Sequence, residues 1–189
     1  MSDPTDRPVA PETLAAQGGG AIDPTTGAII PPIHPSTTYA RDAAYQPIDG
    51  RAYSRADNPT YDQVEAVLAR LEGGAAAMLF ASGLAATASL FQALPPGAHV
   101  VASNEMYFGT RKLLRELAMP AGLAVDFVDT ADPAAVKAAM RAGATRLVYI
   151  ETPSNPTWRV TDIAGVAAIA HAGGALLAVD STAATPVLT

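Results

Sequence analysis

The sequence predicts an α/β fold whose mostly parallel sheet is covered by helices on both faces. Apolar runs of five to seven residues alternate with helical segments from residue 75 onward. Several of these helical segments begin at a polar or proline residue or end in glycine, which are the usual start and stop signals. The hydrophobic content of 49% is that of a globular protein and excludes a disordered chain. Alternation of this kind is typical of parallel sheets.

Residues 1–57 are predicted to form an extended arm. They are rich in Pro, Gly, Thr and Asp, have little periodicity, and suggest only a short helix around Thr13–Gln17. So long an irregular stretch is uncommon in a compact protein unless it is functional or covers a partner. The opening letters MSDPTDRPVAPETL contain neither the basic nor the apolar region of a signal peptide, so none is expected.

Regular structure is predicted to begin with a helix at Asn58. Asn58 can cap the first turn, and Pro59 has its φ angle preset for the first helical position. An apolar stripe follows at helical spacing, formed by Val64, Val67, Leu68 and Leu71. Gly73 and Gly74 end the helix, because glycine adopts the left-handed conformation at a helix C-terminus without strain.

Five strands and four more helices are predicted beyond this first helix. The strands are residues 75–80, 99–103, 123–129, 145–151 and 175–180, and the helices are residues 82–94, 110–118, 133–143 and 162–174. The helix at 82–94 is apolar nearly all round and is expected to lie deep. The helix at 110–118 is expected to turn Leu113, Leu114 and Leu117 inward.

The composition excludes several classes of function. The formal net charge is −6 and no run of Lys and Arg occurs, so neither nucleic acid nor an anionic membrane is an expected partner. Cysteine is absent, and His34, His99 and His171 share no ligand spacing, so disulfides, thiolate chemistry and a metal site are not expected. No uncharged run reaches the ~20 residues of a membrane span. A cytoplasmic protein is predicted.

Polar residues follow four of the predicted strands at the point where each ends. They are Ser82-Gly83, Asn104-Glu105, Glu151 through Asn155, and Asp180-Ser181-Thr182. In open α/β sheets, ligands bind beyond the carboxyl ends of the strands. Four polar clusters at four strand ends therefore predict one binding site.

Each cluster by itself has two interpretations. The Ser82–Leu84 turn opens a helix directly after a strand, which suits a phosphate but is also an ordinary serine cap. Asp180 could be a counter-charge for a cationic ring nitrogen or a turn residue. Tyr107 could stack on a cofactor or pack, Asn155 could be a simple turn, and Glu151 could be a salt-bridge partner. A nucleotide-binding protein is disfavoured, because neither the G-x-G-x-x-G nor the P-loop pattern occurs.

Longer motifs point to one family. The segment YSRADNPTYDQVEAVLARLEGG, followed at once by AAAMLFASGLAATASLFQAL, resembles the transsulfuration enzymes that use pyridoxal phosphate. These include cystathionine γ-synthases and lyases, O-acylhomoserine sulfhydrylases and methionine γ-lyase. The resemblance continues through ETPSNPTWRVTDI to AVDSTAATPVLT. It implies a truncated fold-type I (aspartate aminotransferase-like) large domain with three αβα layers, of which residues 58–189 form the first part.

The resemblance also implies cofactor-binding residues. The phosphate would be held by Ser82, Gly83 and Leu84, and the ring by Tyr107, Asn155, Asp180 and Thr182. Asp180 matches the aspartate that keeps the ring nitrogen protonated, and Tyr107 the tyrosine that stacks on the ring. Tyr53 and Arg55 match a pair that reaches the cofactor phosphate of a neighbouring subunit, for which the arginine fork is suited. Tyr107 and Tyr53 are the candidate catalytic residues.

The lysine that forms the Schiff base in this family has no counterpart here. In the family it lies beyond the DSTxATP segment, whereas the two lysines of this chain, Lys112 and Lys137, lie on predicted helix faces. We therefore expect an N-terminal half of a subunit that is inactive alone. At full length the enzyme is expected to be a homotetramer, a dimer of dimers, with a small amino-acid substrate.

The expected reaction is γ-replacement or γ-elimination on a sulfur amino acid or an O-acylhomoserine. The alternatives are a non-catalytic binding or regulatory half-module of the same fold and an O-acylhomoserine sulfhydrylase. Gly109 stands where methionine γ-lyases usually carry cysteine, which argues against that branch. Phe108 replaces the common small residue and is expected to alter the pocket wall beside the ring.

Overall fold

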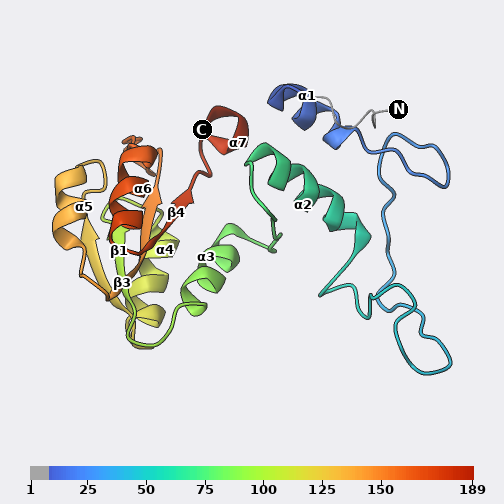
Figure 1. The fold of residues 1–189 in the computed structure, drawn as a ribbon, viewed down its shortest axis with the longest axis horizontal. Coiled ribbons are helices and arrows are strands. Elements are labelled where there is room, and N and C mark those ends of the chain that lie inside the picture. Colours follow the sequence, from blue (N-terminus) through green and yellow to red (C-terminus); the bar gives the residue numbers. More distant parts are fainter. Residues whose placement is uncertain (1–8) are drawn as a thin grey trace. The chain divides into compact units, whose positions relative to one another are not determined.

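The computed structural model describes residues 9–189, which form two compact units (Figure 1). The first unit extends to Leu79 and the second spans Phe80–Thr189. The arm predicted for residues 1–57 includes residues 1–8, which lie outside the described residues. The predicted boundary after residue 57, between the arm and the large domain, stays a prediction.

The second unit contains a four-stranded parallel sheet in the order β2-β1-β3-β4. Its strands are β1 (His99–Ser103), β2 (Ala124–Val128), β3 (Thr145–Glu151) and β4 (Leu176–Asp180). Every adjacent pair is parallel, so the predicted sheet is confirmed. The chain goes from β1 outward to β2 and then crosses back to β3, which makes the β1/β3 boundary the point where the strand order reverses.

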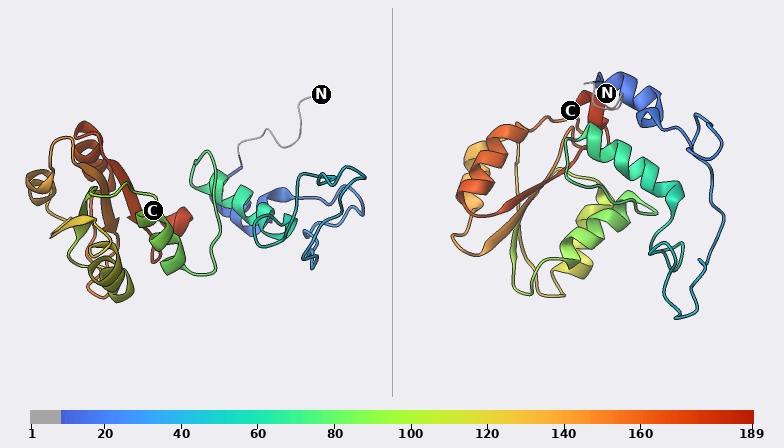
Figure 2. Two further views of the ribbon diagram at one scale, coloured as in Figure 1. Left: turned by 90° about the horizontal axis from the view of Figure 1, so that it is seen from below. Right: turned by 45° about the vertical axis from the view of Figure 1, so that its right-hand side comes forward.

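Helices cover both faces of this sheet, as predicted (Figure 2). They are α3 (Gly83–Gln92), α4 (Phe108–Leu113), α5 (Pro133–Ala139) and α6 (Ile163–Ala172). A short last helix, α7 (Thr185–Leu188), follows β4 and has no buried residue. On one face, Phe91 of α3 packs in a cluster with Val100 of β1. On the other, Val136 of α5 and Val166 of α6 pack with Val148 of β3. Burial of these apolar side chains is the main stabilisation of the unit.

Three helices differ from their predictions, and of these α5, predicted over residues 133–143, ends at Ala139 because Met140 is extended. The predicted helix at 110–118 begins at Phe108 and widens into a π-helical turn, η3 (Leu114–Ala118). The wider turn, closed by the bond from the Met119 N–H to the Leu114 carbonyl, leaves Leu117 exposed instead of inward. Helix α3 is not deep along its length, because only Phe91 in its last turn is buried against the sheet.

The strand predicted at 75–80 is wrong. This segment has no regular structure, and Met78 is 73% exposed. A strand exists only when its backbone groups pair with a neighbour, and no described segment pairs with these residues. One hydrogen bond, from the Leu79 N–H to the Glu65 carboxylate at 2.7 Å, joins the end of this segment to the helix of residues 59–71.

The first unit is built from a few helices and a long irregular chain. The helices are α1 (Pro11–Ala16), the 3-10 turn η2 (Gly18–Gly20) and α2 (Pro59–Leu71). Asn58 caps α2 as predicted, accepting a bond from the Thr60 N–H at 2.8 Å. Its amide also donates to the carbonyl of His34 at 3.1 Å, so one side chain joins the arm to the helix. No described helix is long and apolar enough to cross a membrane.

Candidate functional site

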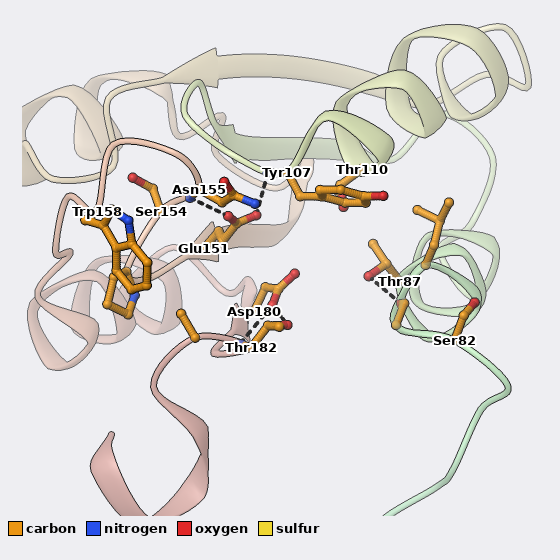
Figure 3. A pocket seen from close by; sticks show the side chains of 14 residues that line it. Ser82, Thr87, Tyr107, Thr110, Glu151, Ser154, Asn155, Trp158, Asp180 and Thr182 are labelled. Atoms are coloured by element: carbon orange, nitrogen blue, oxygen red, sulfur yellow. Dashed lines mark hydrogen bonds between the residues drawn. The ribbon is translucent and has the colours of Figure 1, made fainter.

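A cavity of about 510 Å³ opens at the carboxyl ends of β1, β3 and β4 (Figure 3). Seven of the predicted cofactor residues line it: Ser82, Gly83, Leu84, Tyr107, Asn155, Asp180 and Thr182. The loops after β1 and β3 diverge at the point where the strand order reverses, which leaves the crevice in which ligands of open α/β sheets bind. Three of the four polar clusters that were predicted to share one site therefore line one cavity, and Asn104-Glu105 do not.

The N-terminus of α3 forms one side of the cavity. The Ser82 hydroxyl accepts a bond from the Ala85 N–H at 3.1 Å, so the interpretation of Ser82 as a cap is confirmed. Gly83 and Leu84 come next in the first turn, where N–H groups have no partner within the helix. The helix dipole adds partial positive charge there. Capping and anion binding are thus compatible at this turn.

Asp180 lies across the cavity at the end of β4. Its Oδ1 accepts bonds from the N–H and the hydroxyl of Thr182 at 3.1 and 2.5 Å. Its Oδ2 accepts a bond from the buried Tyr149 hydroxyl at 3.1 Å. Burial raises the pKa of Tyr149 far above its usual range, and the Asp180 charge adds to the rise, so Tyr149 stays a neutral donor. These bonds hold the carboxylate in one orientation.

Tyr107 lies at the start of α4, on the wall of the cavity. A Cβ added at Gly109 would come within 2.4 Å of the Tyr107 ring, far inside contact distance. Only glycine at 109 therefore permits this ring position, and Gly109 acquires a role that the sequence analysis did not assign. Phe108 is exposed and is not among the cavity residues, so it does not form the pocket wall as predicted.

The loop after β3 supplies Asn155 and Trp158. The Trp158 N–H donates to the Ser154 carbonyl at 2.7 Å, and Trp158 has a φ of 57°, an uncommon value for a bulky residue. Its indole lies at the cavity and is mostly exposed. Trp158 was not predicted as a site residue, because no pattern in the segment SNPTW indicates one.

Two threonines of the cavity were also missed. Thr87 follows Gly83 by four residues and donates to its carbonyl at 3.1 Å, while Thr110 follows Tyr107 by three. Both line the cavity. Helical spacing places each on the same face as a predicted site residue, so this spacing could have identified them.

Glu151 is not a salt-bridge partner. Its oxygens accept the backbone N–H groups of Tyr107 at 2.6 Å and of Asn155 at 2.7 Å. Burial raises the pKa of Glu151, and the two N–H donors act in the opposite direction. The sequence suggestion of an ion pair was wrong, because backbone donors from two loops satisfy the carboxylate.

Some polar residues that were predicted to cluster lie elsewhere. Asn104 and Glu105 follow β1 but line a separate small hollow. There, Glu105 accepts a bond from Thr157 at 2.5 Å and lies 3.7 Å from the guanidinium of Arg159. These contacts join the loops after β1 and β3 outside the cavity. Among residues 9–189, no three His, Asp or Glu side chains gather as metal ligands.

Tyr53 and Arg55 belong to the first unit. The Arg55 guanidinium lies over the Tyr53 ring, 4.9 Å from its centre, in a cation–π arrangement. Neither lysine is a cavity residue. Lys112 is exposed and lies 3.8 Å from Glu116, and Lys137 is exposed on α5, so both are on solvated helix faces as predicted.

Known proteins were compared with the chain by sequence and by structure. Residues 12–189 match the family model described as Cys/Met metabolism PLP-dependent enzyme, where PLP is pyridoxal 5′-phosphate. The chain belongs to this family. The predicted recognition is therefore confirmed, and the family depends on pyridoxal phosphate, the predicted cofactor.

Relatives within the Cys/Met family are transsulfuration enzymes. A probable cystathionine γ-synthase of Herpetosiphon aurantiacus is 40% identical, with 92% of this chain matching 54% of that protein. A cystathionine β-lyase of Lactococcus lactis subsp. cremoris is 39% identical, with 94% of this chain matching 46% of that protein. The crystal structure of cystathionine γ-lyase from Lactobacillus plantarum, complexed with L-serine, has a TM-score of 0.87 at 39% identity, covering 94% and 46%. The chain thus spans about half the length of its relatives.

The cavity fits the family cofactor in charge and in size. A phosphate needs N–H donors and positive potential, which the first turn of α3 supplies. A protonated ring nitrogen needs a fixed carboxylate, which Asp180 supplies with its three hydrogen bonds. The cavity, with Tyr107 on its wall, is also within the usual size range of small-molecule sites.

Proposed function

We propose that the cavity of the second unit binds pyridoxal 5′-phosphate. The phosphate would lie at the first turn of α3, formed by Ser82, Gly83 and Leu84, and the ring nitrogen at Asp180. The observation that carries the proposal is that a helix N-terminus and an oriented carboxylate border one cavity on different sides (Figure 3). Tyr107, between them, would cover a face of the ring.

The bound cofactor would supply an electron sink for charge that develops at the α-carbon of an amino acid. Asp180 would hold the proton on the ring nitrogen, and Thr182 and Tyr149 would keep its carboxylate aimed at that atom. Asn155 would donate from its side chain to the phenolic oxygen of the ring. Tyr107 over one face of the ring and Trp158 at the edge of the cavity would exclude water, and electrostatic interactions strengthen where water is excluded.

We further propose that the whole protein carries out replacement or elimination at the γ-carbon of a sulfur amino acid or an O-acylhomoserine. The relatives support a transsulfuration reaction: those compared include a γ-synthase, a β-lyase and a γ-lyase solved with L-serine. An O-acylhomoserine sulfhydrylase fits the same residues. In the assembled enzyme, residues 1–57 would contact a neighbouring subunit, and Tyr53 and Arg55 would reach its cofactor phosphate within a homotetramer.

A second function, binding without turnover, is favoured by the position of the lysines. Lys112 and Lys137 lie on exposed helix faces, and neither is a cavity residue. We infer that the lysine that holds the cofactor lies outside these 189 residues. This segment alone would then bind pyridoxal phosphate reversibly and would not turn over substrate.

Equilibrium dialysis of pyridoxal phosphate against the purified chain tests the binding proposal. Saturable binding to the wild type should weaken at least tenfold in Asp180→Asn, which removes the counter-charge and keeps the shape. Glu116→Gln, which removes an exposed charge on η3, should bind as the wild type does. Equal binding by all three proteins would refute the site.

Borohydride reduction and substrate assays test the proposal of binding without turnover. A stoichiometric reduced adduct at Lys112 or Lys137 would contradict reversible binding. Turnover of O-acylhomoserines, cystathionine or methionine by the 189 residues would contradict the lack of activity. The same substrates, assayed with the whole protein, distinguish synthase, lyase and sulfhydrylase.

A further inference from the structure

A single carboxylate connects the two loops that border the proposed ring site. Glu151 is the last residue of β3 and is 5% exposed. Its Oε2 accepts the N–H of Tyr107, which precedes α4 on the neighbouring loop, and its Oε1 accepts the N–H of Asn155 on the loop that follows β3. The bonds measure 2.6 and 2.7 Å, the short lengths of charge-assisted hydrogen bonds.

A carboxylate is suited to this position in a way that other side chains are not. It presents two acceptor oxygens, whereas an amide of the same size presents one acceptor and one donor. The described residues provide Glu151 with no cationic partner, so its buried charge is stabilised by these N–H donors. Burying such a group is costly unless it is hydrogen-bonded, which makes each bond to it strong.

Glu151 is not needed merely to keep the two loops together, because another contact already does this. Outside the cavity, Glu105 already joins the loops through Thr157 and Arg159. What Glu151 adds is local: it fixes the backbone of the two residues whose side chains face the proposed ring. Gly109 allows the Tyr107 ring its position, and Glu151 fixes the backbone from which that ring projects.

We propose that Glu151 is a positioning residue that sets the Tyr107 ring and the Asn155 amide to receive one cofactor ring. This proposal rests on the function proposed above. In it, the Glu151 carboxylate alone aligns the two loops that face the cofactor ring. Loss of one bond to a buried carboxylate corresponds to roughly a 10- to 100-fold change in an equilibrium constant. Comparable losses of cofactor affinity are expected when Glu151 is changed.

The experiment combines amide exchange without ligand and dialysis of pyridoxal phosphate. In the labelled wild-type chain, the amide protons of Tyr107 and Asn155 should exchange slowly by NMR. Glu151→Gln keeps the shape and should speed exchange at one of the two amides, and Glu151→Ala at both. Affinity for pyridoxal phosphate should fall roughly 10-fold in the first variant and further in the second. Glu105→Gln, which leaves both amides bonded, should keep wild-type exchange at both and affinity within about threefold.

A pH profile separates positioning from a general loss of stability. Burial raises the pKa of Glu151, the charge of Asp180 adds to the rise, and the N–H groups of Tyr107 and Asn155 oppose it. As the pH falls through this pKa, protonation removes an acceptor from one loop. The wild-type affinity should therefore decline toward acid more steeply than that of Glu151→Gln, which lacks the titrating group. A variant that is merely less stable would lower its melting temperature and keep the wild-type pH profile.

The outcomes distinguish this inference from the proposed function. If the wild type binds pyridoxal phosphate and Glu151→Gln binds it as tightly with the same pH profile, the positioning role is overturned and the cofactor site stands. If the wild type does not bind, the proposed function fails and the positioning role fails with it, even where the amides lose protection.

Discussion

The two units of the chain are ordered by different means. In the second unit, parallel strands bury apolar side chains on both faces, and fifteen of the sixteen buried apolar residues described belong to it. Among the apolar residues of the first unit that the structure describes, only Leu14 is buried. Its order depends on polar contacts such as the hydrogen bonds and ion pairs of Arg51 with Asp49, Asp57 and Asp62.

The second unit therefore has a hydrophobic core of its own, whereas the first unit exposes apolar side chains to solvent. Ile29, Ile30 and Ile33 lie on the first unit and are each at least 75% exposed. Exposed apolar surface of this kind marks interaction sites. It supports the proposal that the arm contacts a neighbouring subunit.

The largest expected effect comes from a matched pair of isoleucines. Ile150 is fully buried in β3, whereas Ile33 is 82% exposed. Ile150→Ala should lower the free energy of unfolding by about 2–5 kcal/mol, because it removes buried methyl groups and leaves a cavity. Ile33→Ala should change it by less than about 0.5 kcal/mol. Urea unfolding followed by circular dichroism measures both, and similar losses would break the contrast.

A smaller effect is expected from the two helix caps. Asn58→Ala removes the cap of α2 and the bond to the arm at His34, and should cost about 1–3 kcal/mol in the first unit. Ser82→Ala removes only the cap of α3 and should cost about 1 kcal/mol. Hydrogen exchange of the α2 and α3 amides measures each unit separately. If Asn58→Ala left hydrogen exchange in α2 unchanged, the idea that polar contacts order the first unit would be contradicted.

The sheet unit should also be sensitive to acid through His99. His99 is buried between Thr145 and Asp126, at 2.8 and 3.2 Å. Burial and the nearby Arg141 charge lower its pKa in the folded state, so the unfolded state binds the proton more readily. Stability should therefore fall as the pH drops below about 6.5. Thermal unfolding between pH 8 and 5 tests this.

The control for this pH effect is His99→Asn, which cannot titrate in this range. It should lower stability at every pH and flatten the decline toward acid. An unchanged slope would assign the acid sensitivity to other groups.

The smallest effect is expected from Tyr149→Phe. The change keeps the ring that packs against Phe91, 5.4 Å between centres, and removes the bond to Asp180. Unfolding free energy should fall by about 0.5–1.5 kcal/mol, and pyridoxal phosphate should bind more weakly because the carboxylate loses one of its restraints. Urea unfolding measures the change in stability, and equilibrium dialysis measures the change in affinity for pyridoxal phosphate. Tighter binding would show that Tyr149 opposes the proposed geometry.

The sequence predicted the sheet unit well because its signals are local. Four of five strands and the helices between them follow from apolar runs and end signals such as Pro133 at the start of α5 and the glycines after α6. The absence of a strand at 75–80 could not be predicted from local signals, because a strand requires a neighbouring strand that the local sequence does not identify. The exposure of Leu117 depends on a π-helical turn that likewise leaves no local pattern.

The site was predictable where side chains define it. The strand-end pattern and the longer motifs placed Ser82, Tyr107, Asn155 and Asp180 at one cavity. The partners of Glu151 were not predictable, since both are backbone N–H groups and every residue except proline carries one. The role of Gly109 was not predictable either, because it depends on where the Tyr107 ring lies in the folded structure.

Trp158 has a practical consequence, because it is the one tryptophan of the chain and it borders the cavity. Excitation of tryptophan therefore reports on this one place in the molecule. Entry of a ligand, movement of the loop after β3 or closure by a partner would each change the same emission. The protein carries its own optical probe, and no label is needed to follow what enters the cavity.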